Sequence, residues 1–575
     1  MRCHICLILS YHATILEVMI NKLLLVFIMV LAVFPDVFSQ AIQAETVLHS
    51  APFSKGVNFS SWFEGDSAES VNFTMYTEQD FADVKRLGAD VIRLPVKMHS
   101  MTNGAPDYTL DPLLLKFLDM AVDWAEKYGL YIIIDNHSFH PINRTPDDID
   151  KILIPVWAQI ARRYRDRGDY VVYEILNEPH GISDSRWGEI QGMAIETIRR
   201  YDQRHAIIVG GTDYNSIGKL SAIPGYSDPN LIYTFHFYDP FLFTHQGASW
   251  SDPLVAHLSG VPFPYERRRM PRIPARLRGT WVENNLNNDY PRDSSSSKLS
   301  DTLDRVVAFS RERGVPVFCG EFGVYIPYSP PEDRVRWYEF VADALDRRNI
   351  SRTSWDYYGG FGIFNTEQRG DINHDLNVAL VRAMGFTPPV QSVRRQDVID
   401  AGFTIYDDYT DSKYAIPSYW GDGMELSFYD VNSAEGEFAI RWANAARYNA
   451  FRFVLTYFDF SRLASEGYFL EFKARTERPV NFDVRFVNSE SSSSIPWRTR
   501  YTIDGKILPP DGKWHTIRIP LSAMEEQGAW VNSRQQWVEP RRRFSWQDVR
   551  SLEFVAENSD MKGLRVWIDS IRITR

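Results

Sequence analysis

Between residues 54 and 385 the sequence alternates eight times between a short apolar run and an amphipathic segment. Residues 131–134 read Tyr-Ile-Ile-Ile, a run typical of a parallel strand that is buried on both faces. Between the runs, apolar residues recur at three- and four-residue spacing, as from Asp111 to Tyr128. Eight strand–helix units predict an α/β fold, the (β/α)8 TIM barrel. The predicted strands are 55–59, 91–96, 131–137, 171–178, 206–211, 231–238, 315–322 and 351–358.

A second region with a different period follows. After Pro388-Pro389 and a short polar segment, apolar and polar residues alternate one by one, as in 469–475 and 564–569. This alternation, broken at short intervals by Gly, Asn, Asp and Ser, is typical of antiparallel strands in a sandwich. The sequence therefore predicts a barrel domain over 46–388, a linker over 389–400 and an all-β, jelly-roll-like sandwich over 401–575.

The N-terminal segment has the order of a secretory signal peptide. Lys22 precedes an apolar run from Leu23 to Phe34, which is followed by a polar cleavage region ending at Ser39. The run is shorter than the ~20 apolar residues that a membrane-spanning helix needs. We therefore expect residues 1–39 to be removed, with Met19 as an alternative start. The mature protein is expected to be secreted or periplasmic, without a membrane span.

Composition narrows the class of partner. A net charge of −11 argues against nucleic acid, because nucleic-acid-binding proteins carry a basic surface. The 16 Trp, 29 Tyr and 35 Phe suit a protein that handles glycans, since flat rings stack on sugar faces, although β-rich cores also use them. The 13 His residues lack a His-x-x-x-His spacing with a nearby Glu. We expect no metal and no cofactor in the barrel, at most a structural calcium in the sandwich, and a monomer.

Polar side chains gather at the ends of the predicted barrel strands. In a barrel these ends converge on one mouth, where catalytic groups sit. Two of the side chains are carboxylates, which is what glycosidic hydrolysis needs: one acid protonates the leaving oxygen and the other stabilises or attacks the sugar carbon. Either glutamate alone could be an ordinary ion-pair partner, but the full set favours the catalytic interpretation. In chain order the set is Arg93, His137, Asn177, Glu178, His236, Tyr238, Glu321 and Trp355.

This set, in this order on eight strands, resembles glycoside hydrolase family five. The resemblance covers about residues 46–388, and the segment 243–250 resembles the endoglucanase branch. It implies a retaining double displacement, with Glu178 as the general acid/base and Glu321 as the nucleophile. His245 and Trp250, within that segment, are candidate cleft residues.

The resemblance also implies supporting roles. Asn177 would bind the sugar 2-hydroxyl, Tyr238 would donate to the nucleophile, and His236 would support the acid/base. Arg93 would help to keep the nucleophile ionised, and Trp355 would form the floor under the distorted sugar. His137 belongs to the same set, although it could merely bond a loop. Ser138 departs from the family pattern, because many relatives carry a second His there.

The sandwich has a resemblance of its own. Its closing strand, 566–571, is similar to the last strand of jelly-roll carbohydrate-binding modules. Trp497, Trp530 and Trp537 fall in loop-like segments, so they are candidates for a sugar platform. A purely structural or docking role for this region is the alternative.

Together these features predict a secreted endo-β-1,4-glucanase that acts on β-glucan polysaccharide or oligosaccharide. A β-mannanase or another β-glucan hydrolase on the same barrel is the alternative within the class. A non-catalytic glycan-binding protein is the remote alternative outside it.

Overall fold

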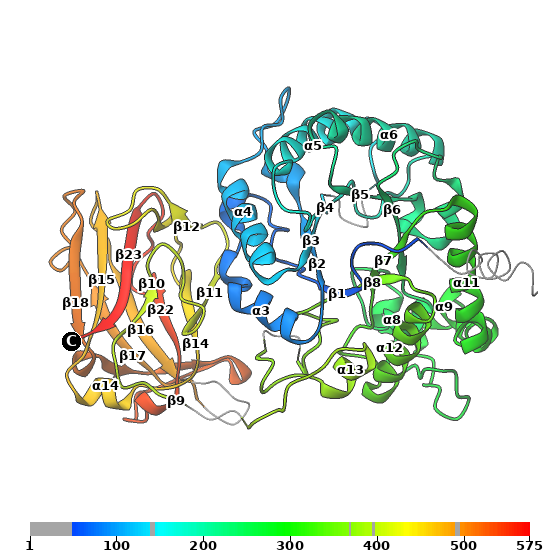
Figure 1. Ribbon diagram of the computed structural model, residues 1–575. Helices are drawn as coiled ribbons and strands as arrows, with labels where there is room; N and C mark the ends of the chain where they lie inside the picture. The colour runs from blue at the N-terminus through cyan, green and yellow to red at the C-terminus, as the bar shows by residue number, and fades with distance from the viewer. Residues whose placement is uncertain (1–48, 139–143, 367–369, 394–396, 489–494) are drawn as a thin grey trace, which may run out of the picture.

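A computed structural model describes residues 49–138, 144–366, 370–393, 397–488 and 495–575 (Figure 1). The predicted signal peptide lies outside these residues, as does part of the predicted linker, 394–396. Among the helices of the described ranges, none combines the length and the apolar character that crossing a bilayer requires.

The first domain is a closed barrel of eight parallel strands, which confirms the predicted fold. β1 pairs with β2 on one side and with β8 on the other, so the sheet has no edge. The strands are β1 (Lys55–Asn58), β2 (Val91–Val96), β3 (Tyr131–Asn136), β4 (Val171–Glu174), β5 (Ala206–Gly210), β6 (Leu231–Phe237), β7 (Val317–Phe322) and β8 (Ser351–Ser354).

Helices surround this barrel, as Figure 1 shows. Most of them lie in the connections between consecutive strands. The long connection from β6 to β7 also contains short helices before α11. The α-helices are α3 (Glu78–Arg86), α4 (Pro112–Tyr128), α5 (Asp150–Tyr164), α6 (Asp184–Tyr201), α7 (Thr212–Asn215), α8 (Phe241–Thr244), α9 (Trp281–Asn288), α10 (Tyr290–Asp293), α11 (Ser296–Arg313), α12 (Pro331–Asp346) and α13 (Val378–Ala383).

The predicted fourth and eighth strands are too long. β4 ends at Glu174, and past it the Asn177 N–H donates to the Asn136 carbonyl at the end of β3 (3.0 Å). Glu178 then adopts a left-handed conformation with φ of 47°, which a strand cannot contain. β8 likewise ends at Ser354. The sequence pattern predicts that the polar and aromatic residues beyond these ends continue the strands. In the structure they turn into the barrel mouth instead.

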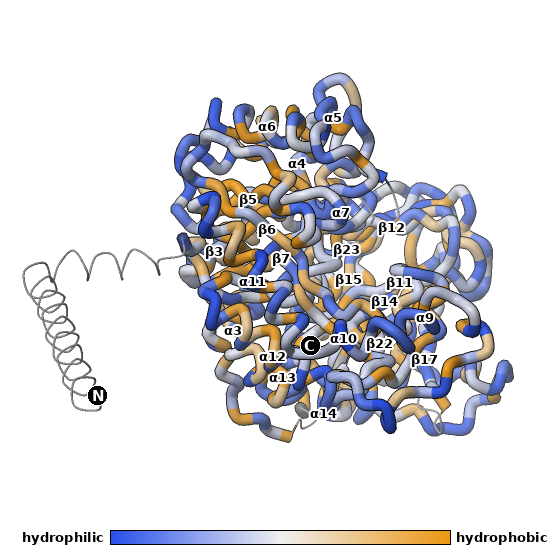
Figure 2. Tube along the Cα trace, turned by 90° about the vertical axis from the view of Figure 1, so that its right-hand side faces the viewer, coloured by the Kyte–Doolittle hydropathy of each residue, from blue (hydrophilic) through white to orange (hydrophobic). Residues whose placement is uncertain are grey.

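Side-chain alternation divides the barrel interior into an apolar and a polar layer. Val91, Ile133 and Val172 belong to a small buried apolar cluster inside the barrel. Two residues further along the same strands stand Arg93, Asp135 and Glu174, which therefore face the same way. Figure 2 shows the apolar residues concentrated on the strands, and polar residues on the outer helices and loops.

The second domain is a sandwich of two mainly antiparallel sheets, which confirms the predicted all-β region. Phe451 and Phe554 stack in its core with ring centroids 4.7 Å apart. One sheet contains β10 (Phe403–Tyr406), β12 (Glu425–Asp430), β13 (Ala439–Ala443), β15 (Phe469–Thr476), β18 (His515–Pro520) and β23 (Arg565–Thr574). The other contains β9 (Asp397–Val398), β11 (Ala415–Trp420), β14 (Ala450–Asp459), β16 (Phe482–Asn488), β17 (Arg498–Ile503), β19 (Glu525–Gln527) and β22 (Val549–Val555), and a small ribbon pairs β20 (Ala529–Val531) with β21 (Gln536–Val538).

Candidate active site

Glu321 reaches the barrel mouth through a bulge in β7. The pairing with β6 shifts by one residue at this point: Cys319 lies opposite Phe235, but Glu321 lies opposite His236. Gly320 is the extra residue, and a Cβ built on it would lie 3.1 Å from His236 Nε2. A bulge re-aims the side chain that follows it, so Glu321 turns toward the mouth.

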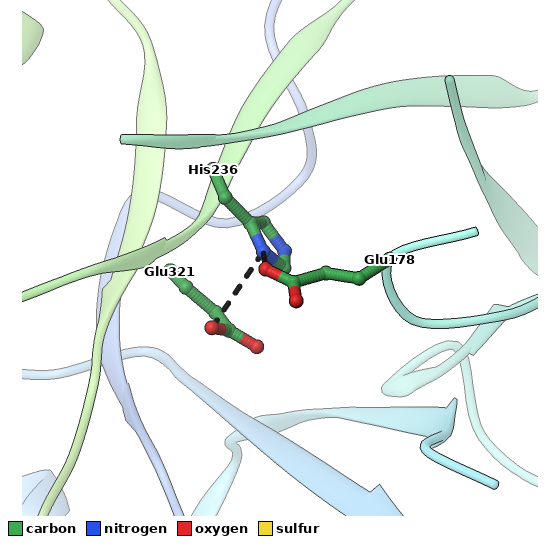
Figure 3. Close-up of side chains that lie close together, drawn as sticks. All are labelled: Glu178, His236 and Glu321. Carbon is green, nitrogen blue, oxygen red and sulfur yellow. Dashed lines mark hydrogen bonds and ion pairs between the residues drawn. The ribbon is translucent and has the colours of Figure 1, made fainter. Parts of the chain in front are cut away.

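The two carboxylates that the sequence singles out lie close together. One oxygen of Glu178 and one of Glu321 are within 4.8 Å of each other, with a His236 nitrogen equally near. His236 Nδ1 lies 2.6 Å from Glu178 Oε1 and 3.6 Å from Glu321 Oε2. Figure 3 shows the carboxylates extending toward each other, with the His236 ring beside both. This separation suits a pair of carboxylates that act on one bond.

Both oxygens of Glu321 accept hydrogen bonds from buried donors. Arg93 Nη1 donates to Oε1 at 2.8 Å, and the Tyr238 hydroxyl donates to Oε2 at 2.9 Å. A second branch of the same guanidinium, Nη2, donates to Asn177 Oδ1 at 2.8 Å. Arg93 therefore fixes Glu321 and Asn177 relative to each other.

Arg93 also contacts two carboxylates that sequence analysis did not place at the site. It donates twice to Glu174, at 2.7 and 3.0 Å, and its Nη2 lies 3.0 Å from Asp135 Oδ2. Burial works against the charged guanidinium, but Asp135, Glu174 and Glu321 outweigh it and raise the pKa of Arg93 well above its usual value. The sequence pattern could have placed Asp135 and Glu174 inside the barrel. Each stands two residues beyond an inward-facing apolar residue, and side chains two residues apart in a strand point to the same face.

The two partners of the Glu178–His236 pair have oppositely shifted pKa values. Burial raises the pKa of Glu178 to about 7, although the nearby charges of His137 and Arg93 oppose the change. Burial lowers the pKa of His236 to about 4. Near neutral pH the site therefore holds a neutral imidazole and a carboxyl group that can carry a proton.

His137 and Trp355 form one wall of the mouth. Their rings stack with centroids 5.7 Å apart and planes inclined by 17°. His137 Nδ1 donates to Asp135 Oδ2 at 2.7 Å, and Asn177 Nδ2 lies 3.3 Å from His137 Nε2. Burial lowers the pKa of His137, but the Asp135 carboxylate outweighs it and raises this pKa to about 9.

His245 and Trp250 connect to the site through the rings of Tyr238 and Phe361. The His245 ring meets Tyr238 edge-on at a centroid distance of 4.9 Å. Trp250 is 42% exposed and contacts Phe361, which in turn contacts the rings of His245 and Tyr238. Trp250 thus offers a partly exposed ring near the hydrogen-bonded residues of the site.

In the described part of the chain, Glu178, His236 and Glu321 are the one group of side chains close enough to share a metal ion. The Arg93 guanidinium already binds one oxygen of Glu321, and the Tyr238 hydroxyl binds the other. A cation at this point would face the Arg93 charge at close range, which disfavours metal binding.

A second candidate site is a cleft of about 890 Å³ on the outer face of the β11–β14–β22–β16–β17 sheet. Trp420, Trp530 and Trp537 line it and remain 36–44% exposed. Its floor carries ion pairs, such as Arg485 Nε with Glu553 Oε2 at 2.7 Å. The cleft thus combines partly exposed indole rings with fixed polar groups.

Of the three tryptophans predicted as a platform, Trp530 and Trp537 line this cleft and Trp497 does not. The residues on either side of it, Pro496 and Arg498, do line the cleft. In extended chain successive side chains point to opposite faces, so Trp497 points away from its two neighbours. The third tryptophan of the cleft lining is Trp420, which was not predicted as part of the platform.

Comparisons with known proteins match both domains. The family model described as cellulase (glycosyl hydrolase family 5) matches residues 53–360, and that of carbohydrate binding domain 30 matches residues 409–575. Endoglucanase C of Acetivibrio thermocellus is 28% identical over 351 residues, which are 57% of this chain and 98% of that protein. Cellodextrinase A of Ruminococcus flavefaciens is 25% identical over 321 residues, 53% of this chain and 86% of that protein.

Among solved structures, the endoglucanase Cel5A from the hyperthermophilic Thermotoga maritima is similar to the barrel. The match has a TM-score of 0.49 and 25% identity, and it covers 58% of this chain and 96% of that one.

Proposed function

Because the chain belongs to glycosyl hydrolase family 5, we propose that it is an endo-β-1,4-glucanase that cleaves β-glucan chains with retention of anomeric configuration. The observation that carries this proposal is the approach of the Glu178 and Glu321 carboxylates to within 4.8 Å. Retaining glycosidases hold their carboxyl groups about 5–5.5 Å apart, whereas inverting enzymes need about 6.5–9.5 Å to admit a water molecule.

The reaction begins with attack of a Glu321 oxygen on the anomeric carbon. Glu178 gives its proton to the glycosidic oxygen as that bond breaks, and the sugar becomes an ester of Glu321. In the second step Glu178, now a carboxylate, takes a proton from water, whose oxygen attacks the anomeric carbon and releases Glu321. Two inversions at one carbon give net retention.

The neighbouring side chains support these steps. Arg93 and Tyr238 hold Glu321 by one hydrogen bond on each oxygen, which orients the attacking atom. We assign Asn177 to the sugar 2-hydroxyl, because Arg93 occupies its oxygen, while its amide nitrogen has two N–H groups and at most one of them is directed at His137. Trp355, whose ring stacks against His137, would form the floor beneath the sugar ring.

Anomeric configuration tests the reaction directly. Proton NMR during hydrolysis of a cello-oligosaccharide should show the β-anomer first, before mutarotation. Early appearance of the α-anomer would contradict the retaining assignment.

Substrate choice is tested with soluble polymers. We expect reducing ends to rise fastest on carboxymethyl cellulose and mixed-linkage glucan, with mannan, xylan and xyloglucan as comparisons. A rapid fall in viscosity with few reducing ends marks endo action. Faster release from mannan than from either glucan would instead favour the β-mannanase alternative.

We further propose that the sandwich cleft binds glycan and that the protein works outside the cytoplasm. The support for glycan binding is the three exposed tryptophans around a floor of fixed charges. A site of this kind raises the local concentration of substrate near the barrel. Sequencing of the mature N-terminus tests the predicted cleavage near residue 39.

A further inference from the structure

The sandwich packs directly against the barrel through a buried aromatic contact. Tyr429 and Phe438 of the sandwich are 7% and 3% exposed and belong to the same apolar cluster as the barrel core. The Tyr429 ring meets Phe117 of α4 edge-on at 4.8 Å, and Tyr409 contacts Phe73 at 5.8 Å. In Figure 1 the sandwich correspondingly adjoins the side of the barrel that carries α3 and α4. The segment predicted as a linker therefore does not keep the domains apart.

Complementary charges surround this aromatic centre. Arg441 of β13 lies 3.2 Å from Glu69 in the segment between β1 and α3. Lys116 of α4 forms an ion pair with Glu437 of the sandwich, and its Nζ lies 5.0 Å from the Phe438 ring centroid. An apolar centre with a charged rim is the composition of a specific interface.

The contact is made with the segment that leads out of the catalytic end of β1. The Phe73 N–H is shared between two acceptors: the Val71 carbonyl at 2.9 Å and the Tyr429 hydroxyl oxygen at 3.1 Å, of which the second is a direct bond between the domains. The Phe73 carbonyl accepts from Trp62 Nε1 at 2.8 Å, and the two rings stack at 5.6 Å. The backbone of Phe73 is thus bonded to the sandwich through its N–H and to the buried Trp62 of its own segment through its carbonyl.

Residues on either side of Trp62 touch the candidate active site. Ser60 Oγ donates to Asp356 Oδ2 at 2.6 Å, directly after Trp355. Glu64 Oε1 lies 3.9 Å from His137 Nε2. Residues 59–77, which we call the β1–α3 loop, therefore run from the sandwich interface at Phe73 to the stacked pair of His137 and Trp355.

We propose that the sandwich positions the β1–α3 loop and is in this way part of the catalytic mouth, in addition to any glycan that it binds. This inference rests on the proposed hydrolase function of the barrel. A domain that acts only as a tether changes the local concentration of polymeric substrate. It does not change kcat or KM for short soluble substrates. A domain that positions the loop changes those constants, because small displacements of positioning groups are costly.

The experiment uses three variants of the full chain. Tyr429→Ala removes the ring and the acceptor oxygen, whereas Tyr429→Phe removes the oxygen alone. The matched control is Thr499→Val, which loses a buried hydroxyl oxygen that accepts from the Phe486 N–H (3.1 Å) in the other sheet of the sandwich. Hydrogen exchange of the Phe73 amide and the kinetics of cleavage of a soluble cello-oligosaccharide are measured at 25 °C, well below the unfolding transition.

We expect faster exchange at Phe73 in both Tyr429 variants, because the amide then keeps only its bond to the Val71 carbonyl, and none of this acceleration in Thr499→Val. Tyr429→Ala should raise KM about fivefold or more, because the loop at His137 and Trp355 shifts, and Tyr429→Phe should raise it less. Unchanged exchange and unchanged KM in folded Tyr429→Ala would overturn the proposal, as would equal effects in Thr499→Val. If Tyr429→Ala does not fold, exchange at Phe73 in Tyr429→Phe decides the question. A wild-type protein that cleaves no glucan would refute the hydrolase function instead, and the exchange result would still stand.

Discussion

The barrel mouth and the sandwich cleft both combine aromatic rings with charged groups, but they arrange them in opposite ways. In the mouth, Arg93 and Glu321 are buried and bonded to each other. In the cleft the charges pair along the floor, while Trp530 and Trp537 stand 44% and 38% exposed. Bond cleavage requires titratable groups whose pKa values are shifted by burial. Binding requires exposed apolar ring faces from which a sugar can displace water. The same residue types therefore serve different tasks according to their exposure.

Replacement of Glu321 by Gln should separate the two regions most sharply. The amide keeps the shape of the side chain but cannot form the glycosyl ester, so we expect kcat to fall on the order of 10⁴-fold or more. Reducing-end assays on a soluble glucan measure the loss, and pull-down with insoluble glucan checks that cleft binding persists. Retention of near-normal rates would exclude Glu321 as the nucleophile.

Removal of the buried guanidinium in Arg93→Met should destabilise the fold strongly. Three carboxylates, Asp135, Glu174 and Glu321, would lose their shared cation, and breaking a buried ion pair costs about 3–5 kcal/mol. Denaturant unfolding measures this change in the free energy of unfolding. The matched variant is Arg485→Met on the cleft floor, where we expect a smaller loss because the cleft is open to water. Equal losses would mean that the two sites are equally desolvated.

Truncation of Trp537 to Ala should weaken binding to insoluble glucan. A tryptophan at the centre of a contact contributes about 2 kcal/mol or more, so we expect roughly a thirtyfold rise in the dissociation constant. A binding isotherm on insoluble glucan measures it. Trp497→Ala is the control, since Trp497 lies outside the cleft lining. If Trp497→Ala weakened binding more than Trp537→Ala, the cleft would not be the binding surface.

The pH dependence should separate the two regions as well. Burial raises the pKa of Glu178 to about 7. Its proton, required for the first step, is present below that pH and lost as pH rises through it. We expect kcat/KM on a natural glucan to fall about tenfold per pH unit above about 7. Retention of the intact protein on insoluble glucan should stay constant over the same range. An activity profile that is flat through pH 8 would exclude Glu178 as the acid.

The fold follows from the sequence to a large extent. Buried parallel strands are continuous apolar runs, so the pattern from residue 54 to 385 identified all eight barrel strands. The ends of β4 and β8 were placed too late, because Asn177, Glu178 and Trp355 continue an apolar run in sequence yet turn out of the sheet. Periodicity records which residues are buried, and it does not record where hydrogen bonding between strands stops.

The sequence by itself determined the fold class, the two domains and the residue types at the strand ends, because these depend on local periodicity and on side-chain chemistry. Only the tertiary structure decided which of these groups meet. The bulge at Gly320, the ion pairs of Arg93 with Asp135 and Glu174, and the bond from Phe73 to Tyr429 all join segments that are distant in the chain or re-aim a side chain. Such contacts depend on strand register and domain packing, which no local pattern of residues encodes.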